Sequence, residues 1–325
     1  MAYRKDTSLP WLEILEGSLT CKACGQEYPI RKGVPCMITG PLPEEVQQTV
    51  EGFGWEWNTF NKQIQDTYMT DSVHFLDFIY PTTDSFFEDK VVLDAGCGAG
   101  RFLKLGAQFG SSDIIGVDLS HSVDAAYCNT RAMPNAHVVQ ADILALPFVE
   151  QFDYIFSIGV LHHMQSPGEG FSSLAKLLRE KGKISVWVYS KENNGWVIHL
   201  LTPLRTYITS HLPKPMLYLA SHILGFILYV CVKLIYKPAN ENRLGLKLGR
   251  LLPYNDYLYY ISRLNYASLV SVIFDHLVPQ LASYVSKEEI RSWFCEANLS
   301  DVMITERNNM SWRGQGTRAA RPGVA

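Results

Sequence analysis

Three glycines at alternate positions follow a short apolar run, and this pattern is suited to holding a nucleoside. The run over residues 91–93 leads into Asp94, and Gly96, Gly98 and Gly100 come next. Because glycine lacks a Cβ atom, the chain can turn sharply off a strand here, and a ligand can approach the backbone. The Asp94 carboxylate can accept a hydrogen bond from a ligand amine or brace the turn.

The spacing of the glycines separates two kinds of nucleotide site. A dinucleotide fingerprint, G-x-G-x-x-G, would need a glycine where this chain has Arg101. The spacing G-x-G-x-G instead favours a nucleoside without a pyrophosphate, so a nicotinamide oxidoreductase is disfavoured. Packing of the turn against its neighbours is the alternative reason for these glycines.

Two further carboxylates follow apolar runs downstream. Asp118 has the spacing at which a Rossmann unit places an acid on the ribose hydroxyls. Asp142, or its neighbouring backbone N–H, can read an adenine edge. The alternatives are a solvated acid at a strand end for Asp118 and a cap of the next turn for Asp142. Two apolar neighbours are expected to pack on the adenosine, namely Leu119 and Ile143.

These residues need a parallel sheet to bring them together. Strand-like and helical patterns alternate between residues 90 and 190, which indicates an α/β fold. We expect strands at 91–93, 114–117, 136–140, 152–158, 184–189 and 302–305, and helices at 101–109, 167–180 and 287–298, the last capped by Ser286. The domains expected are an N-terminal lobe (1–50), a helical lid (51–89), a core (90–190), an apolar insertion (191–285) and a return to the core (286–325).

Composition narrows the classes of protein. The chain has 325 residues, 47% of them hydrophobic, which is enough for a sizeable core. Its net charge of −3 gives no overall attraction to nucleic acid, so we expect no nucleic-acid partner. Seven cysteines without a framework spacing suit a reducing compartment, and residues 1–19 lack the apolar stretch of a secretory signal.

Four segments in order resemble the motifs of class I S-adenosylmethionine-dependent methyltransferases. They are the glycine motif at 91–102, the acidic motif at 115–120, the adenine motif at 140–148 and the fourth-strand motif at 152–164. The resemblance implies a Rossmann-like sheet of seven strands in the order 3-2-1-4-5-7-6, with S-adenosylmethionine as cofactor. The group it resembles most is the UbiE-like or methyltransferase type 11 group, which acts on small molecules and lipids.

The resemblance also assigns roles to residues. Methyl transfer from a sulfonium is an in-line displacement, so the protein mainly aligns the nucleophile and excludes water. His162 and His163 follow the fourth strand, where the acceptor pocket is implied, and are the candidate bases. Alternatively, one packs on the cofactor and the other caps a helix. The cofactor-binding residues implied are Asp94, Gly96, Cys97, Gly98, Gly100, Asp118, Leu119, Asp142, Ile143 and Trp57.

Trp57 belongs to an aromatic run over 53–60, ahead of the glycine motif. In the enzymes that this chain resembles, the corresponding segment is a helical lid over the cofactor, where an aromatic ring can contact the sulfonium. Ordinary hydrophobic packing is the alternative. Further upstream, residues 19–35 resemble a Trm112-like zinc ribbon that has lost one of its two C-x-x-C pairs. Since zinc needs four ligands and only three cysteines are near, we expect no metal; the three are Cys21, Cys24 and Cys36.

The insertion contains an apolar stretch, 216–236, close to the roughly 20 residues of a membrane span. A membrane crossing, an interfacial hairpin with 196–212, and a buried cap over the acceptor pocket are the alternatives. A single crossing would divide the sheet between two sides of the membrane, so we favour the last two. Both imply a lipid-like acceptor, with peripheral membrane contact through 196–236. His276 is expected to be structural.

We therefore expect a methyltransferase that acts on an O, N or C centre of a small or lipid-like hydrophobic acceptor. The expected location is the cytoplasm, with membrane association left open. The alternative is a non-catalytic scaffold or a membrane-associated partner module. Five intact motif residues argue against that alternative, namely Asp94, Gly96, Gly98, Asp118 and Asp142.

Overall fold

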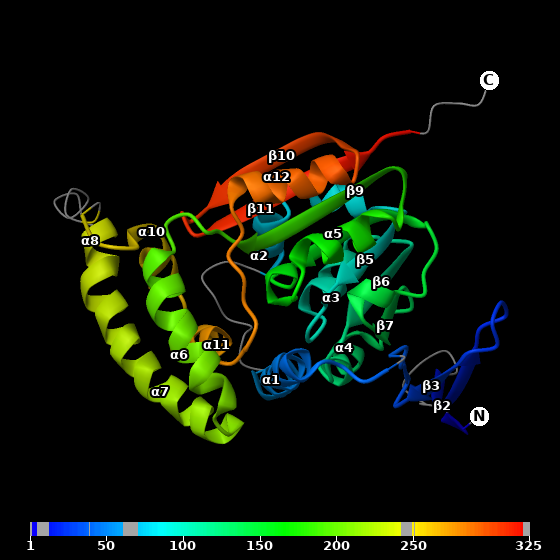
Figure 1. Ribbon diagram of the computed structural model, residues 1–325, viewed down its shortest axis with the longest axis horizontal. Coiled ribbons are helices and arrows are strands. Elements are labelled where there is room, and N and C mark those ends of the chain that lie inside the picture. Colours follow the sequence, from blue (N-terminus) through cyan, green and yellow to red (C-terminus); the bar gives the residue numbers. More distant parts are fainter. Residues whose placement is uncertain are drawn as a thin grey trace.

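A central sheet, a small N-terminal sheet and a helical insertion make up the molecule (Figure 1). The computed structural model describes residues 2–4, 13–38, 40–60, 71–241, 249 and 251–320. In Figure 1 the N-terminal sheet lies at one end of the view and the insertion at the other, with the central sheet between them.

The central sheet has seven strands in the order β10-β11-β9-β8-β5-β6-β7. Numbered within the sheet, this is the order 3-2-1-4-5-7-6, so the expected fold class is confirmed. Strands β5 to β9 pair in parallel, and β11 pairs antiparallel with both β9 and β10. The strands are β5 (Val91–Ala95), β6 (Asp113–Asp118), β7 (Ala136–Gln140), β8 (Phe152–Ile158), β9 (Leu178–Tyr189), β10 (Leu299–Arg307) and β11 (Ser311–Arg318).

The parallel register brings the ends of four strands to one edge. Asp94 on β5 lies opposite Gly116 on β6 and Phe156 on β8. Asp118 on β6 lies opposite Gln140 on β7. Ligands of open α/β sheets bind outside this carboxyl edge, where the strand order reverses. Here the reversal lies between β5 and β8.

Helices cover both faces of the sheet. One face packs on α3 (Arg101–Gln108) and α4 (Val123–Thr130), and the other on α5 (Pro167–Ala175) and α12 (Lys287–Glu296). The cap of α12 is confirmed, because the N–H of Glu289 donates to Ser286 Oγ at 3.1 Å.

The helix expected over 167–180 is shorter than its pattern. It ends at Ala175, and β9 begins at Leu178. Leu178 is fully buried opposite Phe152, so its apolar character serves the strand rather than the helix.

The N-terminal sheet is antiparallel, with strand order β1-β2-β3-β4. It attaches to the edge of the central sheet, where Cys36 bridges Gln140 and the N–H of Met37 donates to the Gln140 carbonyl at 2.7 Å. Lys32 also pairs with Asp124 of α4 at 3.0 Å. The strands are β1 (Ala2–Arg4), β2 (Glu13–Thr20), β3 (Glu27–Arg31) and β4 (Val34–Pro35).

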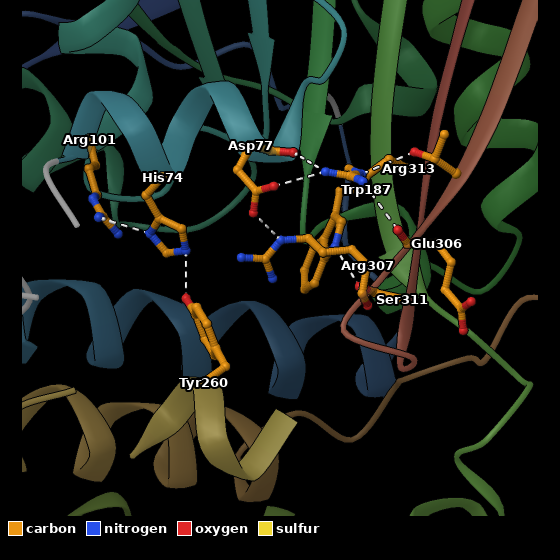
Figure 2. A network of polar contacts seen from close by, with 10 residues as sticks. His74, Asp77, Arg101, Trp187, Tyr260, Glu306, Arg307, Ser311 and Arg313 are labelled. Carbon is orange, nitrogen blue, oxygen red and sulfur yellow. Dashed lines mark hydrogen bonds and ion pairs between the residues drawn. The ribbon is translucent and has the colours of Figure 1, made fainter. Parts of the chain in front are cut away.

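Two helices precede the central sheet, α1 (Glu44–Phe60) and α2 (Asp71–Phe78). Figure 2 shows how α2 is fastened to the hairpin of β10 and β11. Asp77 accepts from Arg307 Nε at 2.6 Å and from Arg313 Nη1 at 2.9 Å. Both guanidinium groups are mostly buried, so this shared carboxylate holds α2 firmly against the sheet.

His74 of α2 connects two more elements (Figure 2). Its Nδ1 lies 3.2 Å from Arg101 Nη2, and its Nε2 lies 2.7 Å from the Tyr260 hydroxyl. An arginine only donates, so Nδ1 accepts and Nε2 carries the proton. Burial, with the charges of Arg101 and Arg307, lowers the pKa of His74 to about 3, which keeps the ring neutral. The neutral ring therefore links the core to the insertion.

The insertion is helical, and α7 packs one face on α11. A Cβ on Gly225 of α7 would lie only 2.8 Å from Val270, so glycine allows this close approach. The opposite face is exposed, including Phe226 at 62% and Leu234 at 72%. The elements are η4 (Val197–Leu201), α6 (Thr202–Tyr207), η5 (Thr209–His211), α7 (Lys214–Cys231), η6 (Val232–Tyr236), α8 (Lys237–Glu241), α10 (Asn255–Ile261) and α11 (Tyr266–Leu277).

One helical stretch in the described residues, Lys214–Glu241, is long and apolar enough to cross a membrane. It has 28 residues, and 17% of its most apolar window is buried. Length and composition are the only basis for this statement. Much of its apolar surface is exposed, so this stretch is not a buried cap. The interfacial hairpin stays a prediction.

We predict that Phe75→Ala lowers the free energy of unfolding by about 3–5 kcal/mol, as expected for removal of a buried phenyl ring. Phe75 is fully buried, stacked on Phe102 at 4.9 Å and edge-on to Phe156 at 5.0 Å. Denaturant titration measures the change. Val149→Ala is the control, since Val149 is 73% exposed. Equal effects of the two changes would contradict the packing described here.

Candidate cofactor and acceptor site

Three of the five positions in the turn after β5 need glycine. Gly96 (φ 88°), Gly98 (φ 51°) and Gly100 (φ 77°) all have left-handed backbone conformations. A Cβ on Gly96 would lie 2.2 Å from the Val160 side chain, and one on Gly98 would lie 3.2 Å from the Trp57 ring. Both the backbone angles and the close neighbours therefore require glycine. We call the segment 96–100 the glycine corner.

Asp94 and Cys97 are buried at the glycine corner. Asp94 is 2% exposed, and its Oδ2 has no hydrogen-bond partner in the structure. Burial, together with the charge of Asp118, raises the pKa of Asp94 well above its ordinary value. An orphan oxygen of this kind requires an explanation, and a ligand donor supplies one. Cys97 packs against Gly116, and burial raises the pKa of its thiol, so the sulfur stays protonated.

Asp118 braces the glycine corner. Its Oδ2 accepts from the N–H of Gly98 at 2.9 Å, and its Oδ1 accepts from the N–H and the hydroxyl of Ser120 at 2.8 and 2.7 Å. Ser122 holds the N-cap position before α4. The ribose role of Asp118 stays a prediction.

Asp142 caps the turn that follows β7. Its Oδ1 accepts from the N–H of Leu144 at 2.9 Å, which is the alternative role for this residue. Ile143 is 7% exposed, and Leu119 is half-buried with its carbonyl accepting from Gln140 Nε2 at 3.1 Å. The adenine contacts of these residues stay predictions.

Helix α1 lies against the glycine corner and the loop after β6. Trp57 is half-buried against Gly98, and Gly54 lies close to the backbone of His121. Asn58 Nδ2 donates to the His121 carbonyl at 3.1 Å. This position is the one that a lid over the cofactor would take, and the lid role itself stays a prediction.

The two candidate bases occupy η3 (Leu161–His163), directly after β8. His162 is fully buried with neither ring nitrogen partnered, and burial lowers its pKa well below the ordinary value. His163 Nδ1 lies 2.8 Å from the Leu281 carbonyl, so Nδ1 carries the proton and Nε2 is left to accept. Burial lowers the pKa of His163 to about 3. Since a base works best with a pKa near the operating pH, a base role requires the acceptor to raise these pKa values.

Behind η3, the insertion completes a group of buried polar side chains that the sequence did not reveal. Tyr189 ends β9, and its hydroxyl donates to Asp275 Oδ2 of α11 at 3.1 Å. The centroid of the Tyr189 ring lies 4.0 Å from that of His162 and 5.8 Å from that of His276. We define the buried polar cluster as three fully buried residues, Glu56, His162 and Arg205, with three half-buried ones, Tyr189, Asp275 and His276.

Burial decides which groups of the buried polar cluster are ionised. Burial raises the pKa of Asp275 to about 6, and burial with the charge of Asp275 raises the pKa of Glu56 well above normal. Burial, with the charge of Arg205, lowers the pKa of His276 to about 4. At neutral pH the cluster therefore holds the Arg205 cation, the Asp275 anion and otherwise neutral groups.

Two parts of the chain match known families. Residues 93–186 match the family described as a methyltransferase domain, and residues 7–33 match the family of Trm112p-like proteins. Together with the strand order and the glycine corner, the first match decides the identity of the core. Residues 93–186 form a class I methyltransferase domain. The cofactor of such a domain is S-adenosylmethionine, as the sequence implied.

Curated relatives share this domain. A tRNA U34 carboxymethyltransferase of Pseudoalteromonas translucida is 34% identical over 101 residues, which is 29% of this chain and 30% of the relative. A tRNA (carboxymethyluridine(34)-5-O)-methyltransferase of Arabidopsis thaliana is 33% identical over 135 residues, 38% of this chain and 31% of the relative. The chain thus spans about a third of the length of these relatives. An O-methyltransferase family protein of Burkholderia thailandensis aligns with a TM-score of 0.48 at 12% identity, over 82% of this chain and 60% of that one.

These relatives correct two expectations. A small or lipid-like acceptor and the exclusion of nucleic acid are both wrong, because the relatives are named for tRNA. The net charge of −3 misled because it sums the whole surface, whereas nucleic acid contacts one patch. The apolar insertion misled because much of its apolar area faces outward rather than into a pocket. The membrane contact expected through 196–236 gains no support from these relatives.

The class I cofactor fits the residues present. The glycine corner leaves no Cβ in the way of a nucleoside, and the orphan Oδ2 of Asp94 offers an acceptor for a ligand donor. Among the residues described, no group of three or more His, Cys, Asp and Glu side chains is placed to hold a metal ion.

We predict that Asp118→Ala weakens binding of S-adenosylmethionine by roughly 1–3 kcal/mol, the cost of stranding donors such as the N–H of Gly98. Calorimetric titration measures the dissociation constant. Asp113→Ala, at the exposed start of the same strand, is the matched control and should leave binding unchanged. A dissociation constant that does not move in the Asp118 variant would contradict this role.

We predict that Asp275→Asn changes how stability depends on pH. The folded pKa of about 6 exceeds the ordinary 3.8, so the native state holds this proton more tightly than the unfolded state. The wild type therefore loses stability as pH rises from about 4 to about 6, by roughly 3 kcal/mol in all. The neutral amide can still accept from Tyr189 and should show no such loss.

The measurement is the free energy of unfolding of both proteins at low and at neutral pH. The variant should gain on the wild type as pH rises. Asp301→Asn, which changes an exposed carboxyl, is the control. If the variant is instead less stable than the wild type at neutral pH, the ionised Asp275 stabilises the fold.

Proposed function

We propose that this chain is an S-adenosylmethionine-dependent methyltransferase whose acceptor is a tRNA nucleoside, and that it acts in the cytoplasm. The observation that carries the proposal is the glycine corner with its orphan Asp94 oxygen, inside a domain whose curated relatives are named for tRNA. The bound cofactor supplies a methyl group that its sulfonium has already activated.

The residues of the carboxyl edge hold and cover the cofactor in this proposal. Asp94 accepts from the ligand amine, and Asp118 orders the glycine corner and faces the ribose. Trp57 covers the corner from α1 and helps to exclude water, which strengthens the electrostatic interactions inside. The remaining contacts come from Gly96, Cys97, Gly98, Gly100, Leu119, Asp142 and Ile143.

The acceptor reaches the same edge from the side of β8. His162 and His163 stand there as the proposed catalytic pair, and His163 offers its Nε2 as a hydrogen-bond acceptor. With low pKa values they act first as neutral groups that align the nucleophile, since alignment is most of what an in-line displacement needs. A nucleoside in a tRNA loop can unstack and enter such a site.

The test is methyl transfer to tRNA by the full chain. Purified protein is incubated with bulk tRNA and isotope-labelled S-adenosylmethionine, and the digested nucleosides are analysed by mass spectrometry. We predict label in one nucleoside and at least a tenfold slower rate in Asp94→Ala, while Asp113→Ala keeps the wild-type rate. Binding of the cofactor without any labelled nucleoside, using tRNA from cells that lack this protein, would contradict the proposal.

A further inference from the structure

Arg205 of α6 is a buried cation, and two of its three guanidinium nitrogens have no hydrogen-bond partner. Its side chain is 0% exposed, and neither Nε nor Nη1 has a hydrogen-bond partner in the structure. Its Nη2 makes one long contact, 3.5 Å, with the Thr202 hydroxyl. Within the described part of the chain, no carboxylate comes within salt-bridge distance of this guanidinium. A buried charge left in this way is costly unless something else pairs with it.

Two carboxylates share the buried polar cluster with Arg205, and neither accepts a hydrogen bond from its guanidinium. The charge of Arg205 lowers the pKa of Asp275, so the two charges interact, but Asp275 Oδ2 accepts from Tyr189 at 3.1 Å. Glu56 of α1 is buried with an unpartnered Oε2, and its raised pKa keeps it protonated. Asp275 therefore balances the charge of Arg205, whereas the described part of the chain supplies no hydrogen-bond acceptor for Nε and Nη1.

The position of the buried polar cluster connects it with the transfer site. His162 belongs to it and directly follows β8, the strand beside β5 and the glycine corner. Helix α1 contacts both places, because Trp57 lies against Gly98 and Glu56 belongs to the cluster. An acceptor that approaches the cofactor from the β8 side thus meets the cluster.

We propose that the buried polar cluster is the binding site for the acceptor, and that Arg205 holds an oxyanion of the acceptor through Nε and Nη2. These two N–H groups form one edge of the planar guanidinium, which matches the two oxygens of a carboxylate or a phosphate, and the present contact of Nη2 with Thr202 is long at 3.5 Å. Because Arg205 is 0% exposed, the acceptor reaches it when the insertion and α1 separate. This inference rests on the proposed function for the identity of the acceptor as a nucleoside.

An ionised acid on the acceptor also agrees with the neutral histidines. If the held oxyanion is a carboxylate that receives the methyl group, the nucleophile carries no proton, and no base has to remove one. If it is a phosphate of the tRNA chain, the Arg205 contact positions the nucleoside instead. A carboxylate and a phosphate would contact Arg205 in the same way. A small carboxylate nucleoside and a small phosphate nucleotide therefore tell the two apart.

Binding of small nucleosides tests the site without methyl transfer. Calorimetry with saturating S-adenosylhomocysteine compares 5-carboxymethyluridine, uridine 5′-monophosphate and uridine. We expect at least one of the two anionic ligands to bind tenfold or more tightly than uridine, and the identity of that ligand gives the source. Equal binding of all three would overturn the proposal.

The variants separate an anion-binding role from a structural one. Arg205→Met should abolish the preference for the anion while leaving the affinity for S-adenosylmethionine unchanged, because the guanidinium is lost and the glycine corner is untouched. Arg205→Lys keeps the charge without the fork and should retain part of the preference. Arg291→Met, at an exposed arginine of α12, is the matched control.

An anion preference that survives in Arg205→Met would make Arg205 a structural residue and overturn the inference. Methyl transfer to tRNA is measured in parallel. If the wild type binds the anionic nucleoside through Arg205 but labels no tRNA, the proposed function fails while the anion site stands. If it labels tRNA and Arg205→Met does so equally well, only the inference fails.

Discussion

The hydrogen bond from the N–H of Gly98 to Asp118 is the contact on which the cofactor edge depends. It joins the end of β6 to the glycine corner after β5, and so converts two parallel strand ends into one surface. Left-handed glycines make the corner possible, since a side chain on Gly96 would overlap Val160. The same hydrogen bond places a charge beside Asp94, which helps to explain why that buried carboxyl favours its protonated form.

Burial is the second constraint, and it acts on the acceptor side. Ligand sites are mostly apolar, but here the insertion covers charged and polar groups that water would otherwise satisfy. The consequence is a set of depressed histidine pKa values and raised carboxyl pKa values around one permanent cation, Arg205. Such shifts collect at functional sites because the stability lost there is tolerated for activity. The network of Asp77 and His74 is structural by contrast, since its charges are paired and it fixes α2 to the sheet.

The core could be predicted from the sequence because its signals are local. The apolar runs end in Asp94, Asp118 and Asp142, and parallel pairing must then gather those ends at one edge. The contacts of a single polar side chain are harder to predict. Asp142 can cap a turn or contact a ligand, and its hydrogen bond from the N–H of Leu144 depends on backbone angles that no sequence pattern encodes. The proximity of Arg205 to the residues of α11 could not be predicted, since some 70 residues separate Arg205 from Asp275 and only packing decides which helix faces meet.

The insertion shows why apolar composition alone is a weak guide to a substrate. Helix α7 uses Leu217, Ser221 and Gly225 to pack inward, and leaves side chains such as Phe226 outside. A sequence average combines both faces and suggests an apolar pocket, although the insertion also brings Asp275 and Arg205 into the buried polar cluster. The chemistry of an acceptor is recognised by the few polar groups that converge on it, and apolar area mainly sets how well water is excluded around them. In the proposed acceptor site, the polar groups of this insertion are therefore a better guide to the acceptor than its apolar exterior.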